Sequence, residues 1–100
     1  MTVVVFGALR FPPDVIAKVS PHLRALVETT RANDGCHAYD VAEDLFDKGL
    51  IRFSESWPTW ASLDAHLKAP HIAPWRSACR EHGLIARDFT AYEVGQSRKV

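Results

Sequence analysis

The first apolar segment of the chain, residues 2–9 with the sequence TVVVFGAL, is continuous and rich in β-branched residues, which is typical of a strand. Its apolar residues do not alternate with polar ones. Val3 and Val5 face one way, and Val4 and Phe6 face the other. We therefore expect both faces of this strand to be covered.

The next segment has helical spacing, because its apolar residues recur with a period near 3.6 between residues 15 and 27. Pro21 interrupts this pattern, and Ser20 could cap a new helix with the proline in its first position. We expect one kinked helix or two short helices ending near Arg31. Gly35 is suited to a positive φ just beyond the helix end.

The rest of the chain predicts three further strands and a split helix. Residues 36–46 and 50–57 have strand character, and the sequence DKG at 47–49 indicates a hairpin between them. Residues 58–69 predict a short helix capped by Thr59. Residues 70–83 predict another, with Pro70 in its first turn and Gly83 at its end. Residues 84–94 predict the last strand.

This β-α-β-β-α-β order predicts an α+β fold of the ferredoxin-like, split βαβ type, with helices on one face of a four-stranded antiparallel sheet. The strands look apolar on both faces, so the bare face of the sheet should be buried by another copy of the chain. We therefore expect a homodimer whose sheets meet face to face. Residues 1–95 are assigned to a single domain and residues 96–100 to a frayed C-terminal tail.

Composition and charge narrow the class of protein. Apolar residues make up 47% of the chain, which is typical of a globular protein. The 12 basic residues balance the 12 acidic ones, so no cationic surface for nucleic acid is expected. No apolar run has the length of a signal segment or a membrane span, which predicts a cytoplasmic protein without a membrane partner. Cys36 and Cys79 form no CxxC motif and are expected to be thiols.

Four pieces of sequence, DGCHAYD, ESW, SLDAHLKAPHIAPW and FTAYEV, follow one another along the chain. With their GC-x-x-Y and L-x-A-H-L-x-x-P-H patterns, they resemble the antibiotic biosynthesis monooxygenase (ABM) domain family over residues 2–95. The resemblance is strongest to its small quinol monooxygenase-type members. It implies a ferredoxin-like monomer that dimerises into an α+β barrel. It also implies oxygenation of phenolic or quinol aromatics with O2 as co-substrate and no metal, flavin or haem cofactor.

His66 is the candidate general base, since its position beside Leu63 and Leu67 should place it toward the sheet. Unperturbed histidine titrates near pH 6.5, which suits it to remove a phenolic proton, and the resulting aryloxide can pass an electron to O2. Alternatively, His66 hydrogen-bonds a neighbour and holds two helices in register. His71, at a helix start that disfavours the imidazolium, could orient a substrate oxygen, or be a plain cap or surface residue.

The spacing of the histidines does not predict a metal site. His66 and His71 are five residues apart across a helix break, unlike the i, i+4 pair of a zincin, and no spacing brings His37 to them. Arg76 could stabilise an oxyanion or be a solvated helix charge. The aromatic side chains could be core, or could hold a flat substrate by stacking. We expect the pocket walls to be formed by Tyr39, Phe53, Trp57 and Trp75.

The leading hypothesis is a homodimeric, cofactor-independent monooxygenase that oxidises a small hydroquinone or phenolic aromatic, with His66 and His71 as catalytic residues. One alternative is a non-catalytic dimeric module that binds a small molecule, which needs the pocket but no base. The other is an isomerase-like proton-transfer enzyme on the same barrel, which needs the base but not O2.

Overall fold

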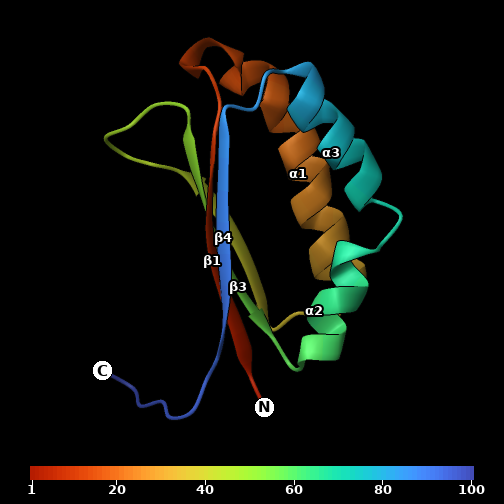
Figure 1. The fold of residues 1–100 in the computed structure, drawn as a ribbon, viewed down its shortest axis with the longest axis vertical. Coiled ribbons are helices and arrows are strands. Elements are labelled where there is room, and N and C mark those ends of the chain that lie inside the picture. Colours follow the sequence, from red (N-terminus) through yellow and green to blue (C-terminus); the bar gives the residue numbers. More distant parts are fainter.

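A four-stranded antiparallel sheet is covered on one face by three α-helices in a computed structural model that describes residues 1–100 (Figure 1). The strand order β2-β3-β1-β4 is that of the ferredoxin-like fold, which confirms the predicted fold class. The strands are β1 (Val3–Arg10), β2 (Ala38–Glu43), β3 (Leu50–Trp57) and β4 (Ala86–Glu93). The helices are α1 (Ile16–Asn33), preceded by the short η1 (Pro13–Val15), α2 (Trp60–Leu67) and α3 (Ile72–Glu81).

The inner face of the sheet carries the core, as the pleat predicts. On β3, Ile51, Phe53, Glu55 and Trp57 are all buried, whereas Arg52 between them is exposed. Three of these four are apolar, so their burial against the helices supplies much of the driving force for folding. Glu55 is the exception, because it is an acidic side chain buried at an inward position.

Of the two arrangements expected after β1, one kinked helix or two short helices, the structure has a single helix. Residues Ile16–Asn33 form one unbroken α-helix with Pro21 inside it, and Ser20 does not cap a separate helix. Pro21 lies only one and a half turns from the helix start. It has no N–H to donate to the carbonyl of Ala17, and both residues are exposed. Water can therefore hydrate that carbonyl, which makes the interruption tolerable.

The helix ends follow the predicted signals. Thr59 caps α2: its Oγ1 accepts the backbone N–H of Ser62, and the Ser62 hydroxyl accepts the backbone N–H of Thr59. Gly35 and Gly83, each one residue beyond the C-cap of α1 or α3, adopt positive φ angles of 72° and 76°. None of the helices combines the length and apolar character needed to cross a membrane.

The outer face of the sheet is less apolar than expected. Only β1 is apolar on both faces, because β3 presents Arg52, Ser54 and Ser56 outward. The helices leave this face uncovered (Figure 1). Phe6 of β1 and Tyr92 of β4 are 57% and 52% exposed there, with ring centroids 6.3 Å apart. The bare face thus carries an apolar patch formed by β1 and Tyr92 rather than a wholly apolar surface, since β4 also presents Asp88 and Thr90 outward.

Candidate active site

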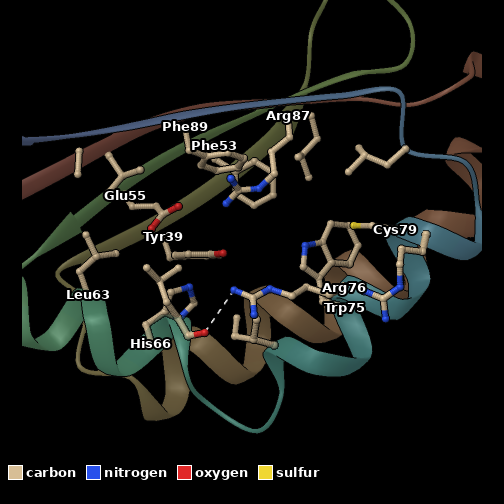
Figure 2. Close-up of a pocket in the computed structure, with 17 residues that line it drawn as sticks. Tyr39, Phe53, Glu55, Leu63, His66, Trp75, Arg76, Cys79, Arg87 and Phe89 are labelled. Carbon is tan, nitrogen blue, oxygen red and sulfur yellow. Dashed lines mark hydrogen bonds between the residues drawn. The ribbon is translucent and has the colours of Figure 1, made fainter.

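A cavity of about 480 Å³ lies between the inner face of the sheet and helices α2 and α3 (Figure 2). Its size is within the range of small-molecule sites. Of its 17 lining residues, 12 are hydrophobic. The aromatic rings of the lining are Tyr39, Phe53, Trp75 and Phe89. Its ionisable nitrogen and carboxyl groups belong to Glu55, His66, Arg76, Arg80 and Arg87.

The cavity brings together four of the six residues singled out from the sequence. His66, Tyr39, Phe53 and Trp75 line it, whereas Trp57 and His71 do not. Trp57 is fully buried beside His66, with its ring centroid 4.7 Å from that of the imidazole. Its contribution is therefore indirect, because it packs against the imidazole instead of forming a wall.

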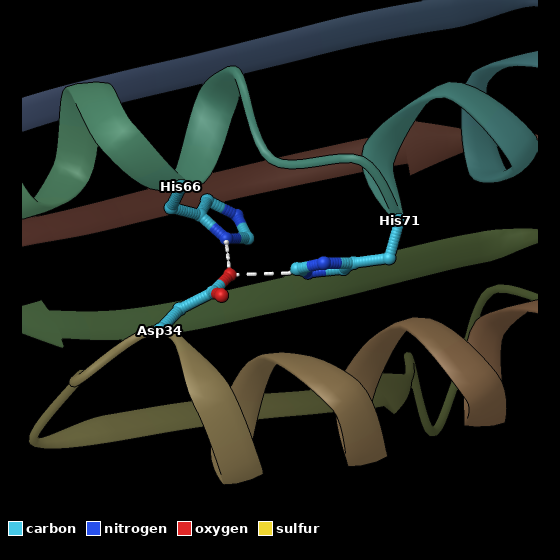
Figure 3. A group of neighbouring side chains, drawn as sticks. All are labelled: Asp34, His66 and His71. Atoms are coloured by element: carbon cyan, nitrogen blue, oxygen red, sulfur yellow. Dashed lines mark hydrogen bonds and ion pairs between the residues drawn. The ribbon is translucent and has the colours of Figure 1, made fainter.

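His66 and His71 both approach the carboxylate of Asp34 (Figure 3). Oδ2 of Asp34 lies 2.7 Å from Nδ1 of His66 and 3.0 Å from Nε2 of His71. The same His71 nitrogen is 3.1 Å from Oγ1 of Thr30. Asp34 is therefore the centre of a triad that joins three separate helix ends.

Local structure explains how these side chains meet. Asp34 follows the last residue of α1, where its backbone N–H donates to Thr30, and the positive φ of Gly35 turns the chain toward β2. His66 lies in the last turn of α2. His71 occupies the link that leads into α3, so the two histidines reach Asp34 from consecutive helices.

The hydrogen bonds define the protonation of His66. A carboxylate only accepts hydrogen bonds, so the His66 nitrogen that faces Asp34 must carry a proton. Burial lowers the pKa of His66 below its usual 6.5, and it outweighs the opposing effect of the Asp34 hydrogen bond. The ring is then neutral at pH 7 with its proton on Nδ1. Nε2, which has no protein partner, is left as an unprotonated base on a ring that lines the cavity.

Two further polar groups line the same space. Burial raises the pKa of Glu55, partly offset by the hydrogen bond that Trp57 donates from Nε1 to Oε1 at 2.9 Å. Burial also raises the pKa of Tyr39 strongly, so its hydroxyl remains protonated and is a potential donor. The cavity therefore offers a base, a carboxyl with elevated pKa and a phenolic hydroxyl around an apolar interior.

The triad could also supply metal ligands. One atom from each of Asp34, His66 and His71 lies within 4.8 Å of the others, and imidazole and carboxylate are donors that zinc accepts. The two nitrogens are now within direct hydrogen-bonding distance of the carboxylate. An ion could enter only by displacing the Nδ1 proton of His66 and opening the nitrogen–oxygen separations from 2.7 and 3.0 Å to roughly 3.3 Å, as tetrahedral zinc geometry requires.

Three important side chains were not singled out from the sequence. Glu55 and Arg87 could have been found from the strand pattern. Residues two apart in a strand point to the same face, and the neighbours of Glu55 and Arg87 at that spacing point inward. A charged residue at such a position is a candidate site residue. Asp34 carried no such signal, since an Asp-Gly pair after a helix is typical of an ordinary turn. Its partner His66 lies 32 residues away, and only the fold brings the two together.

Comparisons with known proteins agree with this architecture. The family model described as "Antibiotic biosynthesis monooxygenase" matches residues 2–78. The Mycobacterium tuberculosis protein named "Putative monooxygenase Rv0793" is 33% identical over 69 residues, which are 69% of this chain and 67% of that protein.

Solved structures give the same result. The structure of Rv0793 is 26% identical, with a TM-score of 0.85 over 99% of this chain and 100% of that chain. A Deinococcus radiodurans structure described as a "putative antibiotic biosynthesis monooxygenase" is 28% identical, with a TM-score of 0.90 over 98% of this chain and 97% of that one. As the sequence patterns predicted, the chain belongs to the antibiotic biosynthesis monooxygenase family.

Proposed function

We propose that the protein is a homodimeric, cofactor-independent monooxygenase that oxidises a small phenolic or hydroquinone aromatic with O2. The observation that supports this most directly is the Asp34–His66 pair at an aromatic-lined cavity. It presents an unprotonated Nε2 where the hydroxyl of a flat substrate would lie. Orientation of a histidine base by a carboxylate is the arrangement that hydrolytic triads use for the same purpose.

The chemistry follows from that base. Nε2 of His66 removes the phenolic proton, and the aryloxide passes an electron to O2. Recombination of the two radicals at a ring carbon forms a hydroperoxide, which loses water to leave a quinone. One oxygen atom enters the product and the other leaves as water, with all electrons supplied by the substrate. The apolar lining excludes water from the aryloxide, and the Tyr39 hydroxyl is placed to donate to a product oxygen.

The test is O2 uptake by metal-stripped protein with a panel of hydroquinones and naphthols. His66→Gln should lower the enzyme-dependent rate at least about 100-fold, because a general base contributes at least that much. His22→Gln is the matched control, since His22 is exposed on α1 and outside the cavity lining. Uptake that never exceeds the autoxidation blank, or that requires an added metal, would rule out this function.

An isomerase-like proton-transfer reaction is the second candidate. The specific observation in its favour is Glu55, a carboxyl with raised pKa that lines the same cavity as the His66 base. Two groups with different proton affinities around one ligand are what acid–base catalysis needs. Deuterium exchange into an α-hydroxyketone without O2 uptake would support this candidate, and loss of exchange in Glu55→Gln would assign the acid.

A further inference from the structure

Three arginines line the cavity, and none of them has an acidic partner within ion-pair distance. Arg76 and Arg80 lie one turn apart on α3, and Arg87 lies on β4 on the sheet side of the cavity (Figure 2). The arginines that do form ion pairs are elsewhere: Arg10, Arg31 and Arg52. Of the five arginines without an ion pair, three therefore lie at this one cavity, and the other two are Arg24 and Arg98.

Each of the three guanidinium groups keeps most of its donors free. Nη2 of Arg76 donates only a long bond of 3.4 Å to the carbonyl of Leu67, at the end of the helix that carries His66. Nη2 of Arg80 donates to Oγ of Ser77 at 3.1 Å. Arg87 lies over the Phe89 ring, 4.8 Å from its centroid. Because a guanidinium has five N–H groups, these contacts leave enough donors to bind a ligand.

The charge balance of the lining is positive. Glu55 is the only acidic lining residue, and one of its oxygens already accepts the Trp57 indole N–H. The positive charges also affect a buried group of the lining. Those of Arg80 and Arg87 act on the Cys79 thiol to lower its pKa, although burial dominates and raises it to about 11. A cleft with one sign of charge and apolar walls concentrates ligands of the opposite sign.

We propose that the ligand of this cavity is an aromatic acid, in which a carboxylate or another anionic group accompanies the ring. Arg76, Arg80 and Arg87 would hold the anion, because the planar guanidinium matches a carboxylate in bidentate geometry. The ring would lie against Phe53 and Phe89, with its hydroxyl toward His66. The identification of this ligand as a substrate rests on the proposed function, whereas its binding does not.

The experiment uses two probes that share one ring system and nearly one shape, of which only the first carries a negative charge. Binding of 2-naphthoate and of neutral 2-naphthamide to the full chain is measured by isothermal titration calorimetry at low salt. We expect the naphthoate to bind at least about tenfold more tightly, with the difference shrinking as salt is added. Equal affinities for the two probes would overturn the proposal.

Charge-removing variants locate the effect. Arg76→Gln and Arg87→Gln should each reduce naphthoate affinity by roughly tenfold and leave naphthamide affinity unchanged. Arg24→Gln, which alters an exposed arginine of α1 outside the cavity lining, is the matched control and should change neither. Naphthoate binding that is unaffected by the cavity variants, or that falls equally in the control, would also overturn the proposal. A thermal melt of each variant confirms that it is folded.

The outcomes separate this inference from the proposed function. In one outcome, the protein and its His66→Gln variant both bind naphthoate selectively, and no hydroxylated aromatic acid supports O2 uptake. This result would support the anion site and reject the monooxygenase. Equal turnover of neutral and carboxylated hydroquinones would sustain the monooxygenase and reject the anion site.

Discussion

Nδ1 of His66 lies 2.7 Å from Oδ2 of Asp34, and this contact determines which nitrogen of the ring faces the ligand cavity as a base. Without the carboxylate, the ring could carry its proton on either nitrogen and rotate within its site. Asp34 does not line the cavity. In the proposed mechanism it is therefore a positioning residue that acts through His66, and Nε2 of His71 lies 3.0 Å from the same oxygen.

The first prediction concerns Asp34→Asn. We expect the O2-uptake rate to fall roughly 100-fold, because the amide no longer selects the Nδ1–H tautomer. Asp34 also raises the pKa of His66 against the effect of burial. The acidic limb of the residual pH–rate profile should therefore move to lower pH. A purely structural role for Asp34 would reduce the amount of folded enzyme and leave the position of that limb unchanged.

The control for this variant is Asp64→Asn on the exposed side of α2, which should keep both the rate and the profile. A rate in Asp34→Asn equal to that of the unaltered protein would show that the carboxylate does not act on the base.

The second prediction is the pH dependence of stability. The pKa of His66 is lower in the folded protein than the value near 6.5 of the unfolded chain, so below that pH the unfolded chain binds more protons. The stabilising contribution is complete above about pH 6.5 and is lost as the pH falls toward the folded-state pKa. The charged or titratable groups facing His66 are Asp34, His71, Arg76 and Tyr39, whose ring centroid lies 5.3 Å from that of His66.

The measurement is the melting temperature between pH 8 and pH 5 for the unaltered protein and for His66→Gln. We expect the decrease on acidification to be smaller in the variant, because the glutamine does not titrate. Parallel curves for the two proteins would contradict the assignment of His66 as a group with a lowered pKa.

The third prediction concerns Gly7, which lies opposite Phe89 on the inner face of the sheet. A Cβ at this position would overlap the Phe89 ring at three of its carbon atoms. Gly7→Ala should therefore displace a ring that lines the cavity, raise KM several-fold and cost about 1–3 kcal/mol of stability, as overpacking usually does. Gly95→Ala is the control, since a Cβ there contacts nothing within 4 Å. Unchanged KM and melting temperature in Gly7→Ala would show that Phe89 moves without consequence.

Much of the fold could be predicted because its signals are local. The buried alternation of Ile51, Phe53 and Trp57, the cap at Thr59 and the glycine after each long helix are properties of neighbouring residues. Pro21 left one kinked helix and two short helices both open, for the same reason. A local rule says that proline starts or breaks a helix, whereas packing of the apolar side of α1 on the sheet keeps this helix continuous.

The site could be predicted only in part, because its geometry depends on long-range packing. His66 was identified from its place on an apolar helix face, and the structure buries it as that place implies. The orientation of His71 toward Asp34 instead of the cavity depends on how α2 and α3 pack against the end of α1. No spacing rule relates residues on three separate helices, so the triad could not be derived from the sequence.

The last prediction concerns the bare face of the sheet, where Phe6 and Tyr92 form an exposed aromatic pair. We expect the protein to be a homodimer that buries this pair, because a solvated aromatic patch on a flat sheet is unfavourable. Phe6→Asp should yield a monomer by light scattering, since a carboxylate cannot be desolvated there without a partner. Phe46→Asp is the matched control, as this phenylalanine is even more exposed than Phe6 but lies in the β2–β3 loop rather than on the sheet, and the change should leave the dimer intact. A monodisperse monomer of the unaltered protein at micromolar concentration would contradict the dimer itself, and a dimeric Phe6→Asp variant would place the interface elsewhere.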